Sequence, residues 1–108
     1  MNDEESMDKR APIVWVLNRG SGYDFSAAER YGTLVYLSEG PIPRYAVGGM
    51  YRLFNNALRD SRPDDYILQT SLTTMNSLAA AIFVKKHGCL NLLLWKEEYY
   101  VLRRVVFD

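Results

Sequence analysis

The feature that most constrains the fold of this chain is the alternation of short apolar runs with longer stretches of helical periodicity. Five apolar runs, each bounded by Pro, Gly or polar residues, lie at residues 13–17, 33–37, 66–70, 89–95 and 99–107. Short runs of this kind are typical of strands buried in a sheet. Because helix-forming stretches separate the first four runs, the pattern predicts a mostly parallel sheet of four to five strands. Only Lys96-Glu97-Glu98 separates the last two runs, which predicts a C-terminal antiparallel hairpin.

Three stretches between the runs carry helix signals. Ser26 followed by Glu29 predicts a capping box for a helix of about two turns that ends at Gly32. A second helix is expected to begin between residues 44 and 49, and a third to run from an N-cap at Ser71 to His87. The sequence therefore predicts one small α/β domain, Rossmann-like or flavodoxin-like, with helices on both faces of the sheet. The expected buried faces of the longer helices are Val47, Met50, Tyr51, Phe54, Ala57 and Leu58, and Met75, Leu78, Ala79, Ile82 and Phe83.

The composition limits the class of protein. The chain has 108 residues, 48% of them apolar, which suits a single domain with its own core. Residues 1–10 are expected to be a flexible charged tail and residues 11–108 the domain. Thirteen basic and thirteen acidic residues cancel, so we expect neither nucleic acid nor a membrane as a partner, although a local basic patch stays open. The single Cys89 permits no internal disulfide, which favours the cytoplasm.

Two polar loops follow the first and third strands, at residues 18–26 and 70–76. Right-handed crossovers place the carboxyl ends of these strands side by side, which is where open α/β sheets bind ligands. Backbone N–H groups, hydroxyls and the positive end of the third helix suit a phosphate there. The residues predicted to bind a nucleotide or another phosphorylated small molecule are Asn18, Arg19, Gly20, Ser21, Gly22, Tyr23, Glu39, Arg44, Thr70, Ser71, Thr73 and Thr74.

The first loop has part of a dinucleotide-binding motif. Gly20 and Gly22 would allow a phosphate to approach the backbone, and Glu39 lies where such folds place a ribose-binding acid. Phe25 replaces the third glycine of the motif, however, and a flexible turn explains the two glycines equally well.

The other predicted ligand residues have structural alternatives as well. Ser71 is explained by helix capping alone. Arg19 and Arg44 could meet a phosphate bidentately or lie in solvent. Tyr23 and Tyr45 could stack on a base, or pack against the protein.

Catalytic chemistry has little support in the sequence. Asp24 and Glu39 are the acids of the two loops, and they could hold Mg²⁺ only if they meet. His87, the only histidine, is expected at a helix C-terminus, and Cys89 is expected in the core. We therefore predict no metal, no cofactor and no Ser-His-Asp or Cys-His mechanism.

The last run is long, apolar and expected at a sheet edge. An unprotected edge invites pairing with another chain, which suggests a homo-oligomer. The chain has eight tyrosines, a residue type that is common at protein interfaces. Arg103 and Arg104 lie in the same run and must point to opposite faces.

The stretches YDFSAAERYGTLVYLSEG and TSLTTMNSLAAAIFVKKHG-x-LNLLLW resemble short proteins of tailed phages whose activity is not characterised. The resemblance covers most of the chain after residue 12 and carries no site residues with it. It implies a small viral accessory protein in the cytoplasm of a bacterial host.

Three hypotheses about function follow. The first is a non-catalytic α/β protein that senses or sequesters a nucleotide or another phosphorylated small molecule. The alternative is an interaction protein without a ligand, which pairs with itself or with a host protein through the edge strand. An enzyme that holds Mg²⁺ through Asp24 or Glu39 ranks last, because the sequence has no metal-ligand cluster.

Overall fold

A computed structural model describes residues 10–20, 23–43, 45–70 and 72–108 of the chain. Each predicted strand is present, and so are the two longer helices. The elements are β1 (Ile13–Val16), the 3₁₀ helix η1 (Ser26–Arg30), β2 (Thr33–Tyr36), α2 (Val47–Ala57), the 3₁₀ turn η2 (Leu58–Asp60), β3 (Tyr66–Leu68), α3 (Thr73–His87), β4 (Cys89–Lys96) and β5 (Tyr99–Val106).

The strands form one five-stranded sheet in the order β2-β1-β3-β4-β5. The first four strands are parallel, and β5 runs antiparallel to β4 from the pair Cys89–Val106 to the pair Lys96–Tyr99. The mostly parallel sheet and the C-terminal hairpin are thus confirmed. Because β1 lies between β2 and β3, the chain leaves β1 in one direction and returns past it in the other. The carboxyl ends of β1 and β3 are therefore neighbours, as predicted.

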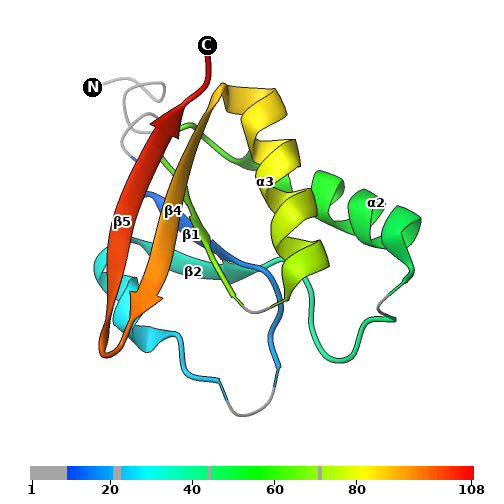
Figure 1. Cartoon of the computed structure of the whole chain (residues 1–108), viewed down its shortest axis with the longest axis horizontal. Coiled ribbons are helices and arrows are strands. Elements are labelled where there is room, and N and C mark those ends of the chain that lie inside the picture. Colours follow the sequence, from blue (N-terminus) through cyan, green and yellow to red (C-terminus); the bar gives the residue numbers. More distant parts are fainter. Residues whose placement is uncertain (1–9, 21–22, 44, 71) are drawn as a thin grey trace.

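Both α-helices cover the same face of the sheet (Figure 1). Met50 and Phe54 of α2 pack with Ile82 and Phe83 of α3 over Trp15 of β1, and all five side chains are buried. The regular spacing of these apolar residues explains why α2 and α3 lie side by side on the sheet.

The opposite face has a much thinner cover. Val14 and Val16 of β1 point to that side, because successive side chains along a strand alternate, and η1 contributes the buried Ala28. The expectation of helices on both faces was therefore wrong for the α-helices. From β1 the chain moves to β2 at one edge of the sheet, whereas the β2–β3 and β3–β4 connections move toward the other edge. A right-handed crossover from β1 to β2 therefore lies on the face opposite the α-helices. It forms only five residues of 3₁₀ helix.

The predicted capping box at η1 is not formed. Phe25 takes the N-cap position of η1, and no side chain caps it. The Asp24 carboxylate instead accepts a hydrogen bond from the Ser26 N–H at 2.9 Å. This bond satisfies the backbone N–H of Ser26, the first residue of η1, without a contribution from Glu29.

Two glycines have clear structural reasons. A Cβ at Gly32 would lie 2.1 Å from the Pro12 carbonyl oxygen, so the chain approaches too closely for any side chain. Gly88 ends α3 with a left-handed φ of 70°, which confirms the predicted stop. Leu72, rather than Ser71, is the N-cap of α3, and Ser71 lies outside the described residues.

A buried carboxylate joins the amino ends of β1 and β3. Asp65 is fully buried and accepts two hydrogen bonds from the Arg10 guanidinium, both at 3.1 Å. It also accepts from the Ile13 N–H, the Trp15 indole N–H and the Arg62 N–H, at 2.9–3.0 Å. Burial opposes ionisation, but Arg10 and these N–H donors outweigh it and lower the pKa of Asp65. Arg10, the last residue of the predicted tail, is thus bonded to the domain.

Candidate ligand-binding site

A cleft of about 650 Å³ opens at the carboxyl ends of β1, β3 and β4. This volume lies within the range of pockets that hold small organic molecules. The cleft lies where the sequence predicted a crevice, at the point where the chain changes direction around β1. Its lining comes from four segments: Asn18 and Gly20; Tyr23, Asp24 and Phe25; Gln69, Thr70 and Leu72; and Leu94, Trp95 and Tyr100.

The Asn18 side chain lies next to the Ser38 hydroxyl. The buried Ser38 hydroxyl lies 2.7 Å from the Leu17 carbonyl oxygen and 2.9 Å from Oδ1 of Asn18. A hydroxyl has one proton, so it can donate to only one of these oxygens. When the hydroxyl donates to Oδ1 it fixes the Asn18 amide with its nitrogen turned away from Ser38, and when it donates to the Leu17 carbonyl it leaves that amide without this bond.

Asn76 fixes the loop that enters α3. Its amide oxygen accepts from the Thr70 N–H at 3.2 Å, and its amide nitrogen donates to the Thr70 carbonyl at 2.6 Å. Thr70 Oγ1 in turn accepts from the Leu72 N–H at 3.2 Å. The loop therefore presents Thr70 to the cleft in a fixed conformation, with its hydroxyl proton available to a ligand.

Two aromatic pairs from distant segments line the cleft. Tyr23 and Phe25 are stacked with an interplanar angle of 14°, and Tyr23 is 71% exposed. Trp95 and Tyr100 meet edge to face with ring centroids 4.9 Å apart, and Trp95 is 53% exposed. Large aromatic surfaces left in solvent at one cleft are available for contact with another ring.

The cleft is acidic rather than basic. Asp24 is the only charged side chain in its described lining. The hydrogen bond from the Ser26 backbone lowers the pKa of Asp24, so this carboxyl is ionised at neutral pH. Burial raises the pKa of Tyr100, and the negative charge of Asp24 adds to that effect. The Tyr100 phenol therefore stays protonated.

The structure brings together four of the predicted ligand residues, namely Asn18, Gly20, Tyr23 and Thr70. Arg19 and Glu39 lie outside the lining and face each other, with 3.7 Å between Nη1 and Oε1. The Arg19 guanidinium also lies 5.1 Å from the centre of the Tyr36 ring. Thr73 and Thr74 belong to the first turn of α3 and do not line the cleft. Ser21, Gly22, Arg44 and Ser71 lie outside the described residues.

The residues that the hairpin contributes to the cleft were not predicted from the sequence. Trp95 and Tyr100 flank the β4–β5 turn, and β4 extends past the end of β3. Gln69 and Leu72 were passed over within a loop that was otherwise predicted to bind. An available signal was the pair of aromatic residues placed symmetrically about the turn at Glu97.

Within the described part of the chain, no helix is long and apolar enough to cross a membrane. Among the same residues there is no group of three or more His, Cys, Asp or Glu side chains that could hold a metal ion.

The fold and the cleft define a small α/β domain with a mostly parallel sheet and an aromatic cleft at the strands' carboxyl ends. The chain belongs to the phage Pam3 gp32-like protein family, whose model matches residues 13–108. The resemblance to phage proteins is therefore confirmed. Neither a curated protein nor a solved structure matches the chain.

Proposed function

We propose that this protein binds a nucleotide or a related phosphorylated small molecule without converting it, and so senses or sequesters that ligand in its host's cytoplasm. The observation that supports this most is the combination of size, position and lining in the cleft. It has the volume of a small-molecule site, it lies at a topological switch point of the sheet, and aromatic side chains from two distant segments line it.

The planar ring of the ligand is the part that the cleft suits best. Tyr23 and Trp95 offer exposed faces for stacking, while the amides of Asn18 and Gln69 can pair with donors and acceptors on a ring edge. The Asp24 carboxylate favours a ring that carries N–H donors over one that carries a negative charge.

A phosphate would lie at the rim rather than inside the cleft. The described lining contains no lysine or arginine, and Asp24 would repel an anion. Arg19 lies between the lining residues Asn18 and Gly20, with a side chain that is 65% exposed, and is the nearest cation in sequence. Its ion pair with Glu39 is exposed and long, so little free energy opposes its exchange for a phosphate.

Thermal unfolding against nucleobases, nucleosides, nucleotides and sugar phosphates tests the proposal. A ligand at a hundred times its Kd adds about 2.7 kcal/mol to the stability of the folded state, which raises Tm by several degrees. If the ring carries most of the affinity, nucleosides should raise Tm nearly as much as the matching nucleotides, and sugar phosphates should have little effect.

Two cleft variants and one control sharpen this experiment. Trp95→Ala removes a stacking surface, and Gly20→Leu adds bulk where the nearest atom to a Cβ is Asn18 Nδ2 at 3.9 Å. Both should lose the rise in Tm. Tyr45→Ala, at an 85% exposed aromatic outside the cleft, should keep it. A panel without any shift, or a shift that survives both cleft variants, would contradict the proposal.

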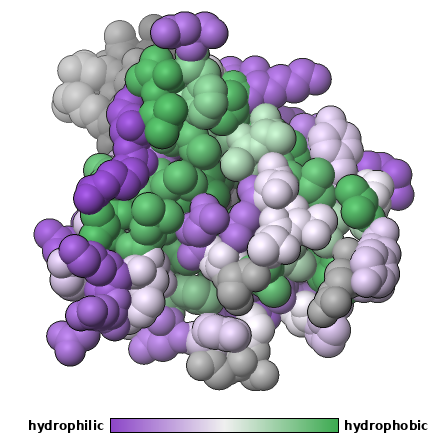
Figure 2. Space-filling model, in the orientation of Figure 1, coloured by the Kyte–Doolittle hydropathy of each residue, from purple (hydrophilic) through white to green (hydrophobic). Residues whose placement is uncertain are grey.

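The outer edge of β5 supports a second candidate function, which is self-association or binding of a host protein. Leu102, Val105, Val106 and Phe107 are exposed large apolar residues near the C-terminus. Figure 2 shows a hydrophobic area where Figure 1 places β4 and β5. Contiguous apolar surface of this kind is common at protein interfaces.

The hydrogen-bond pattern identifies which residues of β5 could pair with another strand. Phe107 N–H donates to the Gly88 carbonyl, and the bonding direction alternates along an antiparallel strand. The even-numbered residues of β5 therefore direct their N–H and C=O groups away from β4. Tyr31 covers the Tyr100 carbonyl with a 3.0 Å hydrogen bond, and the Arg103 guanidinium covers the Leu102 carbonyl at 2.8 Å, which leaves the edge at Arg104 and Val106 for a partner strand.

Mass measurement over a range of concentrations tests this candidate. A dimer through β5 should dissociate on dilution, and Leu102→Lys should shift it toward monomer, since a lysine on an edge strand opposes pairing. A monomer at every concentration would remove self-association from consideration.

A further inference from the structure

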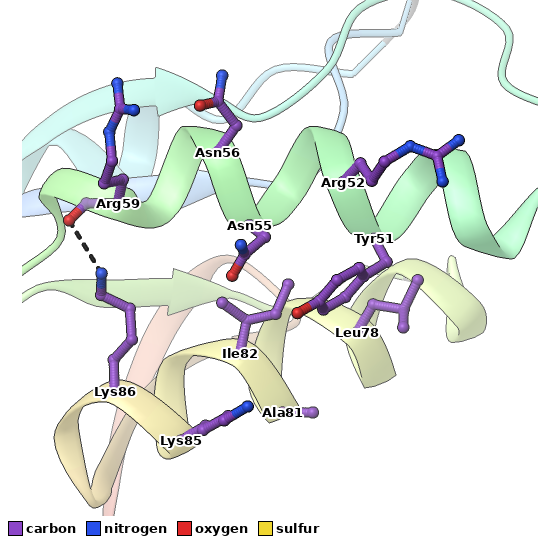
Figure 3. A pocket seen from close by; sticks show the side chains of 10 residues that line it. All are labelled: Tyr51, Arg52, Asn55, Asn56, Arg59, Leu78, Ala81, Ile82, Lys85 and Lys86. Atoms are coloured by element: carbon purple, nitrogen blue, oxygen red, sulfur yellow. Dashed lines mark hydrogen bonds between the residues drawn. The ribbon is translucent and has the colours of Figure 1, made fainter.

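A second depression lies on the far side of α2 and α3, away from the cleft and the sheet. It has a volume of about 730 Å³ and separates the outer surfaces of the two helices (Figure 3). We call it the helical groove. Its lining residues are Tyr51, Arg52, Asn55, Asn56, Arg59, Leu78, Ala81, Ile82, Lys85 and Lys86.

The helical groove concentrates positive charge in a chain that is neutral overall. Four of its ten lining residues are Arg or Lys, and none is Asp or Glu. Arg52 and Arg59 come from one wall, and Lys85 and Lys86 from the other. Within the described residues, no carboxylate lies within the 4.0 Å of an ion pair from any of these four.

Stabilisation of a helix end explains only some of these four cations. Lys85 and Lys86 lie in the last turn of α3, where cations stabilise the helix dipole, and the Lys86 ammonium donates to the Arg59 carbonyl at 2.9 Å. Arg52 lies in the middle of α2, where no such effect acts. Arg52 and Arg59 are two helical turns apart, about 10 Å along the axis. The cations therefore flank the groove along its length.

Neutral donors and an aromatic ring lie between the cations. Figure 3 shows Tyr51 and Asn55 directed into the space above Leu78 and Ile82, while Arg59 and Asn56 project from the opposite rim of α2. No described side chain or backbone group forms a hydrogen bond with either asparagine side chain. Tyr51 is 42% exposed although its position had predicted burial on α2.

We propose that the helical groove binds the backbone of single-stranded nucleic acid. Cations on both walls would meet successive phosphates, the Tyr51 ring would stack on a base, and the Asn55 amide would contact a base edge. A positively charged groove with an aromatic stacking surface is the arrangement by which proteins bind single strands with little sequence preference.

The shape and the chemistry of the groove distinguish this ligand from two others. A duplex is contacted by elements that protrude into its grooves, whereas this site is a depression between two helices. An acidic protein segment would satisfy the cations and could bond Asn55, but it would leave the Tyr51 ring without a planar base to stack on. The neutral net charge of the chain does not oppose the proposal, because electrostatic attraction at this range depends on the local charges.

Fluorescence anisotropy with a labelled oligothymidylate of about 15 nucleotides tests the proposal. We expect binding with a Kd of about 1–100 µM near 50 mM salt, weakening steeply as salt is raised. The double variant Arg52→Ala/Lys85→Ala should weaken binding at least tenfold. Tyr51→Ala should weaken it at least fivefold with an unchanged dependence on salt, because stacking releases no counterions.

The matched control removes two cations elsewhere. Lys96→Ala/Arg103→Ala takes the same charge from exposed positions in the hairpin and should change the Kd less than twofold. No binding near 50 mM salt, or equal weakening by groove and control variants, would overturn the proposal. So would equally tight binding of a labelled poly-glutamate of similar charge, which would assign the groove to an acidic protein. All substituted side chains are exposed, and circular dichroism verifies the fold of each variant.

Discussion

At the amino ends of β1 and β3, the Asp65 carboxylate is fully buried, and five hydrogen bonds satisfy it. At the carboxyl ends of the same two strands, a cleft of about 650 Å³ opens between exposed aromatic side chains. We call these regions the closed end and the open end. The closed end uses polar groups to complete the fold, whereas the open end leaves large aromatic side chains exposed.

If the cleft binds a ligand as we propose, the contrast separates stability from binding within a short chain. A buried carboxylate whose hydrogen bonds are all made stabilises the folded conformation. Removing either Asp65 or Arg10 leaves the charge of the other uncompensated. Residues at the open end make few contacts that the fold requires, so they can be specialised for a ligand. Substitutions at the closed end should therefore reduce stability, and substitutions at the open end should reduce binding.

The largest effect is expected for Asp65→Asn. The change removes the charge that pairs with Arg10 and turns one acceptor of N–H groups into a donor, so it should reduce the free energy of unfolding by about 3–5 kcal/mol. Urea unfolding measures this value. Asp64→Asn, at the exposed neighbour, should change it by less than about 0.5 kcal/mol. A loss of under about 1 kcal/mol at Asp65 would contradict the role assigned to the closed end.

Acid should also reduce the free energy of unfolding, because it protonates the Asp65 carboxylate. The folded pKa of Asp65 lies below its unfolded value, so the stabilisation is present above the unfolded pKa, near 3.9, and is lost as pH falls through the folded pKa. Unfolding free energies measured from neutral pH down to about pH 2 should fall more steeply in the wild type than in Asp65→Asn. Parallel curves for the two proteins would show that other carboxyls carry the acid sensitivity.

A matched pair of glycines gives the next largest difference. Gly32→Ala at the closed end places a Cβ 2.1 Å from the Pro12 carbonyl oxygen and should destabilise the protein by about 1–3 kcal/mol. Gly20→Ala at the open end meets nothing closer than 3.9 Å and should change stability by less than about 0.5 kcal/mol. Equal effects in thermal unfolding would mean that the two ends are packed alike.

A smaller loss of stability than for Asp65→Asn or Gly32→Ala is expected for Trp95→Ala. Its main contact is the edge-to-face pairing with Tyr100, so truncation should reduce the free energy of unfolding by about 1 kcal/mol. The same variant should abolish the rise in Tm produced by a ligand of the cleft. If Trp95→Ala destabilises the protein as much as Asp65→Asn does, the separation between the two ends fails.

The sequence was sufficient to predict the sheet because its strand signals are local. The strands begin and end close to the apolar runs, and the turn at Glu97 and the stop at Gly88 were both predicted. The position of the cleft followed from strand order, since right-handed crossovers put the ends of β1 and β3 side by side. Those predictions needed only neighbouring residues and general rules of connection.

The parts that could not be predicted depend on contacts between distant residues. Nothing in the local sequence distinguishes Asp65 from its neighbour Asp64, and its partner Arg10 lies 55 residues earlier, in the predicted tail. No periodicity links the two. Trp95 joins the cleft because β4 is longer than β3 and carries its end past the loop at Thr70. The apolar run at 89–95 is longer than the run at 66–70, but where its end lies relative to the Thr70 loop depends on the register between β3 and β4 in the folded sheet.

The antiparallel direction of β5 brings the C-terminus back to the closed end. Arg10 is bonded there to Asp65, and Phe107 is bonded to Gly88 just before β4 begins. From β1 to β5 there are three inter-strand spacings, so residue 10 and the C-terminus leave the fold about 14 Å apart. The domain can therefore be inserted as a module into a loop of another protein, or circularly permuted through a short linker, with the cleft facing away from the junction.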